Sequence, residues 1–471
     1  MTSGDAAFYG AISFLTGIAA ATVGVNVYAC ILILAVSLSA AAFWRKINVA
    51  VSCVVFFLFL FGTFYYHLYN NMEENGRNIV FNKTISFSGI VSIEPKPSEK
   101  FQKLELELLS PSAGSIVVLA SLFPEINYGD VIKAEGIIES PSKKGSEPVA
   151  FFPKIEISER NRGFWLKEKL IDFKKSLIAQ FGTFLPSRSA ALLGGLTFGW
   201  QGDFSDEFKD QMSLSGTTHL VALSGYNITI LVLAVAAVFD YFFSRRITFY
   251  LTGLVILLFV LMVGAEASVL RAAIMGFLAL LAKEAGRLSS IRNAVALTAA
   301  MMVFTNPNIL FDIGFSLSFL SLLGIVYLEP PFKKLLRMDS KPNKGSFLSW
   351  RENGLTTLSA QLAVVPVLIL NFGQFSLTSI AANILILELV PLTMFLGFLL
   401  AGASSLFHYI GFLIALPVNI LLQYQIYVIK LFSYIRLPLT TGFGSWVLIM
   451  AYYGILIIFA KHYYESTDKK V

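Results

Sequence analysis

The chain has 471 residues, of which 56% are hydrophobic and 14% are charged, and its formal net charge at pH 7 is +6. Soluble domains carry roughly 25% charged residues, whereas apolar runs of about 18 residues or more, long enough to cross a bilayer, recur along most of this sequence. These values exclude a single soluble domain and predict a polytopic α-helical membrane protein. The excess of Lys and Arg says little about an anionic partner, because membrane proteins use basic residues to fix their orientation.

Three apolar runs open the chain, over residues 6–23, 25–43 and 47–69, and each has the length of a membrane span. The preceding residues, MTSGD, lack the basic segment of a secretory signal, so we interpret the first run as a retained span. Cys30 and Cys53 fall in these apolar runs without a CxxC motif, a setting typical of thiols that act as small apolar side chains.

Residues 71–163 are polar and alternate between apolar and polar side chains with a period of two, which predicts half-buried strands. The strands are expected around 85–93, 104–108, 115–122, 130–138 and 151–158, separated by turn-rich stretches. Five short strands favour one small inserted β-barrel of the oligonucleotide-binding (OB) type, although any small soluble β-domain fits the same pattern.

Residues 164–187 predict an amphipathic helix at the membrane interface, because apolar side chains share one helical face and lysines surround it. The apolar set is Trp165, Leu166, Leu170, Phe173, Leu177 and Ile178, and the lysines are Lys167, Lys169, Lys174 and Lys175. The alternative is an ordinary amphipathic helix packed on the β-domain.

Residues 188–465 form a second series of apolar runs, which we interpret as the main transmembrane domain. After a weaker stretch at 188–200, spans are expected near 218–243, 247–263, 266–282, 291–305, 313–328, 355–370, 376–407, 409–430 and 445–460. Pro391 and Pro417 are expected to kink or break two of these helices. The whole chain then has about 10–12 spans.

The distribution of Lys and Arg predicts the orientation in the membrane. One set of loops and ends holds nearly all the basic residues outside the β-domain: Arg45, Lys46, Arg245, Arg246, Lys283, Arg287, Arg292, the loop 333–351, Lys461, Lys469 and Lys470. The opposite short loops, around Gly264, 306–312 and 371–374, contain none, and Arg436 is a mild exception. This pattern places the basic side and the C-terminus in the cytoplasm and the β-domain outside it, in a multi-pass protein of the cell (inner) membrane.

Catalytic and metal-binding signatures are absent from the sequence, which has no GxxxxGK[ST], HExxH or GxSxG motif and no His/Cys cluster among its four histidines. We therefore expect no enzyme activity, no metal and no cofactor.

Polar side chains inside apolar runs are the most informative residues, because such groups are costly at membrane depth and usually face a cavity or a partner. The candidates for lining a channel are His219, Ser224, Gly225, Tyr226, Asn227, Glu266, Arg271, Asp312, Gln361 and Asn383. The first five lie in the segment THLVALSGYNITIL, where Gly beside a hydroxyl residue favours a broken helix. Plain helix packing explains Ser224 and Gly225 equally well, and a structural ion pair explains Glu266 with Arg271.

Four lysines of the β-domain lie near aromatic residues and are candidates for binding single-stranded DNA: Lys96, Lys100, Lys103 and Lys133. Glutamates of the same domain dilute this charge, so a solvated surface is the alternative interpretation; they include Glu94, Glu99, Glu105, Glu107, Glu125, Glu135, Glu139 and Glu147.

Three stretches together resemble the competence domain of ComEC-type competence proteins. They are residues 191–231, which contain the core HLVALSG, residues 263–325 from VGAEASVLR to FSLSFLSLLGI, and residues 358–391 from LSAQLAVVPV to LILELVP. The resemblance covers most of residues 50–400 and includes, weakly, the β-domain.

By this resemblance the chain is expected to be an inner-membrane channel for single-stranded DNA during natural transformation. The expected partners are single-stranded DNA and membrane lipid, with a separate nuclease, a DNA receptor and a cytoplasmic helicase-type motor. A transporter or channel for a different solute, and a membrane subunit of a separately encoded metallo-hydrolase, are the alternatives.

Two departures from the family pattern limit what the resemblance implies. Tyr226 and Asn227 stand where many relatives have a second histidine. The sequence has no HxHxDH motif and ends about ten residues after its last expected span, so the nuclease activity of relatives with a metallo-β-lactamase-like domain is not expected here.

Overall fold

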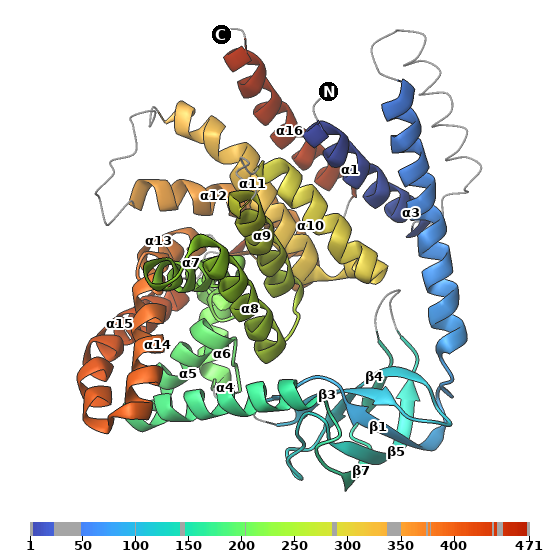
Figure 1. The fold of residues 1–471 in the computed structure, drawn as a ribbon, viewed down its shortest axis with the longest axis vertical. Helices are drawn as coiled ribbons and strands as arrows, with labels where there is room; N and C mark the ends of the chain where they lie inside the picture. The colour runs from blue at the N-terminus through green and yellow to red at the C-terminus, as the bar shows by residue number, and fades with distance from the viewer. Residues whose placement is uncertain are drawn as a thin grey trace. The chain divides into compact units, whose positions relative to one another are not determined.

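A computed structural model gives the fold of the chain (Figure 1). It describes residues 3–22, 49–98, 100–141, 147–202, 204–284, 290–336, 350–373, 375–376, 378–435, 438–439 and 446–468. The chain divides into two compact units. Unit 1 comprises Met1–Ile171 and Leu231–Asp312, and unit 2 comprises Asp172–Ile230 and Ile313–Val471.

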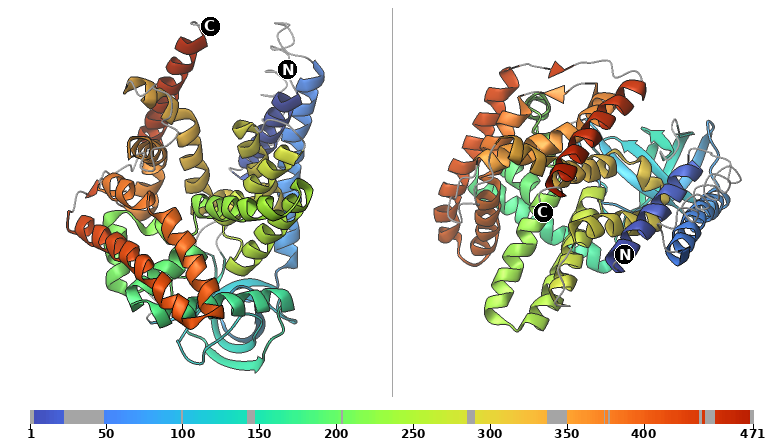
Figure 2. Two further views of the ribbon diagram at one scale, coloured as in Figure 1. Left: turned by 60° about the vertical axis from the view of Figure 1, so that its left-hand side comes forward. Right: turned by 90° about the horizontal axis from the view of Figure 1, so that it is seen from above.

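Unit 1 contains a closed β-barrel of five strands. These are β1 (Thr84–Val91), β3 (Gln102–Leu108), β4 (Gly114–Ala120), β5 (Val131–Glu139) and β6 (Val149–Phe151). They pair in the order β1-β3-β4-β6-β5 and back to β1, and every pair is antiparallel except β4 with β6. The strands, drawn in cyan, form a ring in the left view of Figure 2. This closed arrangement confirms the predicted OB-like domain.

Alternation of side chains builds the barrel core. On β3 the side chains of Leu104, Leu106 and Leu108 are buried, while Lys103 and Glu107 point outward and are exposed. The core also contains Ile116, Val118, Ile132 and Ile138 from β4 and β5. A period of two places every second residue on the same face of a strand, so the alternation in the sequence translates directly into this core.

The predicted strand 151–158 is wrong as a single element. The structure divides it into β6, which ends at Phe151, and β7 (Lys154–Glu159), which pairs with β5 outside the barrel ring. Phe152 has a φ of 45° and Pro153 has no N–H to donate, so the backbone leaves the ladder between the two strands. The two-residue strand β2 (Lys96–Pro97) pairs with β3.

Helices of unit 1 precede and follow the barrel. They are α1 (Ser3–Thr22), α3 (Val49–Gly76), most of α7 (Gly225–Phe242), α8 (Arg245–Val263), α9 (Ala267–Glu284), α10 (Ile291–Thr305) and the 3₁₀ helix η2 (Pro307–Phe311). α1 packs closely along α3 because Gly17 has no side chain. A Cβ at this position would lie 2.2 Å from the carbonyl oxygen of Phe59. The predicted span 25–43 lies outside the described residues.

Unit 2 consists almost entirely of helices. They are the greater part of α4 (Trp165–Phe184), α5 (Ser187–Phe198), α6 (Asp206–Ser215), the 3₁₀ helix η1 (Thr218–Leu220), α11 (Ile313–Leu335), α12 (Trp350–Phe372), α13 (Ser379–Leu387), α14 (Val390–Leu406), α15 (His408–Tyr434) and α16 (Trp446–Asp468). Two short strands, β8 (Phe375–Ser376) and β9 (Pro438–Leu439), pair with each other.

Six helices of the described residues are long and apolar enough to cross a membrane, and α13 with α14 makes a seventh if this bent pair counts as one span. The chain is therefore a polytopic helical membrane protein, as its composition predicts. α13 and α14 bend by 48° at their break, and Pro391 stands in the first turn of α14, as expected. α15 continues through Pro417 as one helix, so this residue does not break the span, and a kink at Pro417 stays a prediction.

The helix α4 differs from its predicted pattern in one respect. The side chain of Lys174 is only 2% exposed and lies on the buried face, while Trp165 and Phe173 are 67% and 56% exposed. The Lys174 ammonium lies 5.9 Å from the centre of the Trp200 ring, so its aliphatic stem packs inward and its charge faces an aromatic surface. The position of α4 at a membrane interface stays a prediction.

Candidate functional site

The segment that contains five of the candidate residues is a broken helix in the structure, as the sequence predicts. η1 carries His219 and ends at Leu220, and α7 begins only at Gly225. The Ser224 hydroxyl accepts a hydrogen bond from the backbone N–H of Asn227 at 3.3 Å and donates one to Asn227 Oδ1 at 3.0 Å. Ser224 therefore caps the N-terminus of α7, which explains why the helix starts at this point.

Asn227 and Tyr226 are neighbours in sequence but differ in environment. Asn227 is 4% exposed, and its amide nitrogen donates to the carbonyl oxygen of Leu196 at 3.1 Å, which ties α7 to α5. Tyr226 is 48% exposed and lies close enough to Glu388 for an electrostatic interaction. Asn227 is thus part of the helix packing, and Tyr226 presents a polar aromatic surface.

A second group of polar residues joins η1 to α12 and α13. His219 is exposed and forms a hydrogen bond with the backbone of Gly216. Gly216 has a φ of +68°, and a Cβ there would lie 2.4 Å from Cβ of Ser379, so only glycine fits this contact. The Ser379 hydroxyl accepts a hydrogen bond from Gln361 at 2.9 Å and donates one to the carbonyl oxygen of Ser376 at 2.7 Å.

Four buried side-chain amide oxygens in unit 2 have no hydrogen-bond partner within the described residues: Gln211 Oε1, Gln361 Oε1, Asn383 Oδ1 and Gln425 Oε1. Asn383 lies four residues after Ser379, on the same face of α13. A buried acceptor without a protein partner is normally satisfied by water. These oxygens therefore indicate hydrated positions inside the helical unit.

Sequence reasoning missed two polar residues of unit 2, Ser379 and Gln425. Gln425 is 1% exposed and donates to the Thr393 hydroxyl at 2.8 Å, which connects α15 with α14. It is a polar residue inside an apolar run, so the signal that identified Gln361 was available. Ser379 carries no such signal, because its role depends on contacts with Gly216 and Gln361, residues distant in the sequence.

Three of the candidates, Glu266, Arg271 and Asp312, belong to unit 1. The carboxylate of Glu266 forms an ion pair with Lys96, with 2.6 Å between Oε1 and Nζ. Arg271 is half-buried on α9, and Asp312 is exposed at the C-terminus of η2. The structure thus joins Glu266, a candidate for the channel, to Lys96, a candidate for binding DNA.

The four lysines of the β-domain do not form one patch. Lys96 and Lys103 are cross-strand neighbours on β2 and β3, and Lys103 also lies 3.7 Å from a carboxylate oxygen of Glu105. Lys100 is exposed in the loop between these strands. Lys133 lies on β5, between β1 and β7, and is therefore on another side of the barrel.

The outer surface of β3 and β4 is acidic and apolar. Glu105 is the cross-strand neighbour of Val117, and Glu107 is the neighbour of Ser115, whose hydroxyl bonds the carboxylate of Glu147 at 3.3 Å. Burial, and then the charge of Glu105, raise the pKa of Glu147 above its ordinary value. Because these strands carry the usual ligand surface of OB domains, this surface repels phosphate more than it attracts it.

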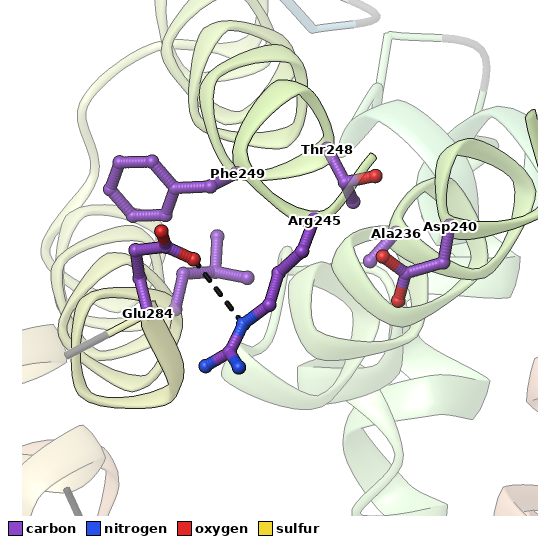
Figure 3. A pocket seen from close by; sticks show the side chains of 7 residues that line it. Ala236, Asp240, Arg245, Thr248, Phe249 and Glu284 are labelled. Atoms are coloured by element: carbon purple, nitrogen blue, oxygen red, sulfur yellow. Dashed lines mark ion pairs between the residues drawn. The ribbon is translucent and has the colours of Figure 1, made fainter. Parts of the chain in front are cut away.

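A shallow pocket in unit 1 contains a further ion pair (Figure 3). Arg245 Nε lies 3.3 Å from a carboxylate oxygen of Glu284, which links the start of α8 to the end of α9. Asp240 and Thr248 complete its polar lining. Within the described residues, no group of three or more His, Cys, Asp or Glu side chains is arranged to hold a metal ion.

These features define a class: a multi-pass helical membrane protein with an OB-like domain inserted after α3 and a polar network inside its helices. A family model described as "Competence protein" matches residues 196–464. The chain therefore belongs to the competence protein family, which confirms the resemblance found in the sequence. All ten candidates for the channel lie within the matched residues, and the four lysines lie outside them.

The chain is also similar to ComE operon protein 3 of Bacillus subtilis (strain 168), with 30% identity over 227 residues. The aligned region is 46% of this chain and 27% of the relative, so the chain matches only part of the relative's length. No solved structure matches the chain significantly.

Proposed function

We propose that this chain serves in DNA uptake during natural competence, and that its membrane helices form a channel for single-stranded DNA. Membership of the competence family supports the first part. The polar network of unit 2 supports the second, because a polyanion crosses hydrocarbon only along a hydrated route lined by polar groups. The observation that carries the proposal is that the amide oxygens of Gln361, Asn383 and Gln425 are buried inside apolar helices without a hydrogen-bond partner among the described residues.

Different residues of the network serve different roles in this proposal. The exposed side chains of His219 and Tyr226 contact the passing strand, and the ring of Tyr226 offers a surface on which bases stack. Asn227 and Ser224 hold the start of α7 in position. Gln361 and Asn383 bind the water that hydrates the route.

The orientation proposed from the basic residues has support from contacts within unit 1. The Lys96–Glu266 pair joins the β-domain to the loop between α8 and α9, and Asn308 donates a hydrogen bond of 2.9 Å to Glu73 at the end of α3. Both loops are free of Lys and Arg. These contacts support the proposal that the β-domain lies on the side of the membrane that the positive-inside rule assigns to the exterior.

Labelled-DNA uptake in deletion and complemented strains tests the function. We expect deletion to abolish uptake and the wild-type gene to restore it. Unchanged uptake after deletion contradicts the proposal and favours a channel for another solute.

Substitutions of two tyrosines on α7 test the route. Tyr226→Ala is expected to reduce uptake roughly fivefold or more, because loss of a stacked aromatic costs about 1–3 kcal/mol per base. Tyr241→Ala is the matched control, since Tyr241 is 84% exposed near the other end of the same helix. Equal uptake by both variants, at equal amounts of protein in the membrane, removes Tyr226 from the route.

A further inference from the structure

The turn between α7 and α8 closes a small pocket within unit 1 (Figure 3). Only Phe243 and Ser244 separate the two helices, and each helix belongs to a candidate membrane span. The pocket has a volume of about 10 Å³, which is room for a single water-sized group. Because it lies where two spans end, we expect it at the level of the lipid headgroups.

The pocket is lined by oxygen atoms that can accept hydrogen bonds. The Thr248 side chain is 3% exposed, and its hydroxyl has no hydrogen-bond partner among the described residues. Glu284 Oε2 is also buried and accepts no hydrogen bond in that part of the chain, although Arg245 Nε lies 3.3 Å away as an ion pair. Asp240 lies on the other side of Arg245 (Figure 3). Buried acceptors without donors are costly, so the pocket is suited to a ligand that donates hydrogen bonds.

A primary ammonium group matches these three acceptors. It has three N–H donors and no acceptor, and its charge is opposite to that of the two carboxylates. It is close in size to a water molecule, so it also matches the volume of the pocket. A quaternary ammonium has no N–H to donate, and its methyl groups need more room than the pocket has. Hydrogen bonding and size therefore both select a primary ammonium group.

A second site, for an anion, lies beside the pocket at the start of α8. The side chain of Arg246 is 87% exposed, and its guanidinium approaches the carboxylate of Glu284 only to 4.0 Å. The first backbone N–H groups of α8 have no acceptor within the helix, and Ser244 at the N-cap makes no side-chain hydrogen bond to them. The start of a helix attracts phosphate, and an arginine adds charged donors. The chain thus offers adjoining positions for an ammonium group and a phosphate group.

The surface around these two positions is apolar and aromatic. Tyr241 and Phe242 at the end of α7 are highly exposed, and so are Tyr250 and Ile247 on α8. Tyrosine is enriched where membrane spans meet the lipid headgroups. The exposed apolar side chains offer a surface on which acyl chains can pack. This setting favours a membrane lipid as the source of the ammonium and phosphate groups.

We propose that the pocket between α7, α8 and α9 binds the headgroup of a phospholipid that carries a primary ammonium group. The ammonium enters the pocket and donates to Thr248, Glu284 and Asp240. The phosphate contacts Arg246 and the first N–H groups of α8, while the acyl chains extend along the exposed side of α8. The lipid joins the ends of three helices of unit 1, and its binding does not depend on the proposed channel function.

Native mass spectrometry of the full chain in detergent tests the site with two lipids of identical acyl chains. Phosphatidylethanolamine and phosphatidylcholine differ only in three methyl groups on nitrogen. From an equimolar mixture, we expect one phosphatidylethanolamine to be retained roughly tenfold more often, because charged donors bonded to buried acceptors contribute a factor of this size. Equal retention of the two lipids overturns the proposal. Preferred retention of phosphatidylglycerol in a matching mixture also overturns it, since that headgroup has no ammonium.

Thr248→Val and Thr252→Val form a matched pair of variants. Both threonines are buried on α8 without a hydrogen-bond partner among the described residues, but Thr248 lines the pocket and Thr252 lies one helical turn farther along. Thr248→Val should reduce the preference for phosphatidylethanolamine roughly fivefold, and Thr252→Val should retain it. Arg246→Gln should weaken retention of both lipids alike, because both carry the phosphate. A preference that survives in both Thr248→Val and Asp240→Asn, or that Thr252→Val loses to the same extent, overturns the site.

Soluble phosphoethanolamine distinguishes a lipid from a small ligand. It offers the same ammonium and phosphate groups without acyl chains, whose contact with the apolar surface of α8 adds to the affinity. At equal concentration it should therefore leave the bound phosphatidylethanolamine in place. Displacement of the lipid under these conditions overturns a membrane lipid as the occupant of the pocket.

Discussion

Replacement of Asn227 by alanine is the most direct test of how the polar network holds the membrane helices. The side chain is 4% exposed and makes two hydrogen bonds, from Ser224 Oγ at 3.0 Å and to the Leu196 carbonyl oxygen at 3.1 Å. Side-chain hydrogen bonds between membrane helices contribute about 0.6 kcal/mol on average and at most about 1.7 kcal/mol. Loss of both should lower the free energy of unfolding by about 1–3 kcal/mol. The chain should still fold, since domains have about 5–15 kcal/mol of stability.

Equilibrium unfolding of the full chain in mixed micelles measures this effect for Asn227→Ala, Ser224→Ala and the double variant. The two residues share a hydrogen bond, so the double variant should lose less than the sum of the single losses, by about 0.5–1 kcal/mol. Thr229→Ala is the matched control, because the exposed Thr229 hydroxyl donates to the Gly225 carbonyl oxygen of its own helix and, among the residues that the structure describes, to no other helix. The reasoning is refuted if Asn227→Ala loses no more stability than Thr229→Ala, or if the two single losses are additive.

Three further predictions follow from the contacts. Lys96→Glu should speed hydrogen exchange in the β2–β3 hairpin, and Glu266→Lys in the same chain should restore the wild-type rate. The effect is at most about 1 kcal/mol because both side chains are at least half exposed. Glu147→Gln should slow hydrogen exchange in β4 and β6 at pH 7. A raised carboxyl pKa means that the barrel loses stability as pH rises through the titration of Glu147. The difference between the two proteins should therefore shrink as pH falls and vanish well below the ordinary carboxyl pKa of 4.5, where Glu147 is protonated in both the folded and the unfolded state. Gly324→Ala should cost about 1–3 kcal/mol in unfolding experiments, because its Cβ would lie 2.5 Å from the backbone of α12. Gly402→Ala on α14, where a Cβ meets open space, should lose no stability.

The barrel shows how far a local pattern predicts structure. The alternation of Leu104, Leu106 and Leu108 with charged residues identified β3 and its buried face, because a strand repeats its direction every two residues. The same pattern failed at Phe152, where a positive φ interrupts the strand. Pro153 in the predicted run was the available signal, since proline cannot donate to a ladder.

The helix break at Ser224 was also within reach of the sequence, but the roles of its residues were not. A hydroxyl residue before glycine is a local cap signal, and the structure shows this cap. Whether Tyr226 or Asn227 faces other helices depends on how α7 is rotated in the bundle. An apolar run surrounded by lipid and protein has no polar face from which to read that rotation. The difference between 48% and 4% exposure therefore emerges only from tertiary packing.

Partner choice is the part of the site that no local pattern contains. Glu266 lies five residues before Arg271, yet its ion pair in the structure is with Lys96, 170 residues away. Local spacing limits which helical neighbours can meet, whereas a loop brings distant residues together only after the chain has folded. The contact matters for the proposed function because it engages a lysine of the β-domain that would otherwise be available to DNA. If DNA approaches this domain, its phosphates must compete with Glu266 for Lys96 and with Glu105 for Lys103. Salt weakens both interactions, so the β-domain is better suited to position the strand weakly than to hold it.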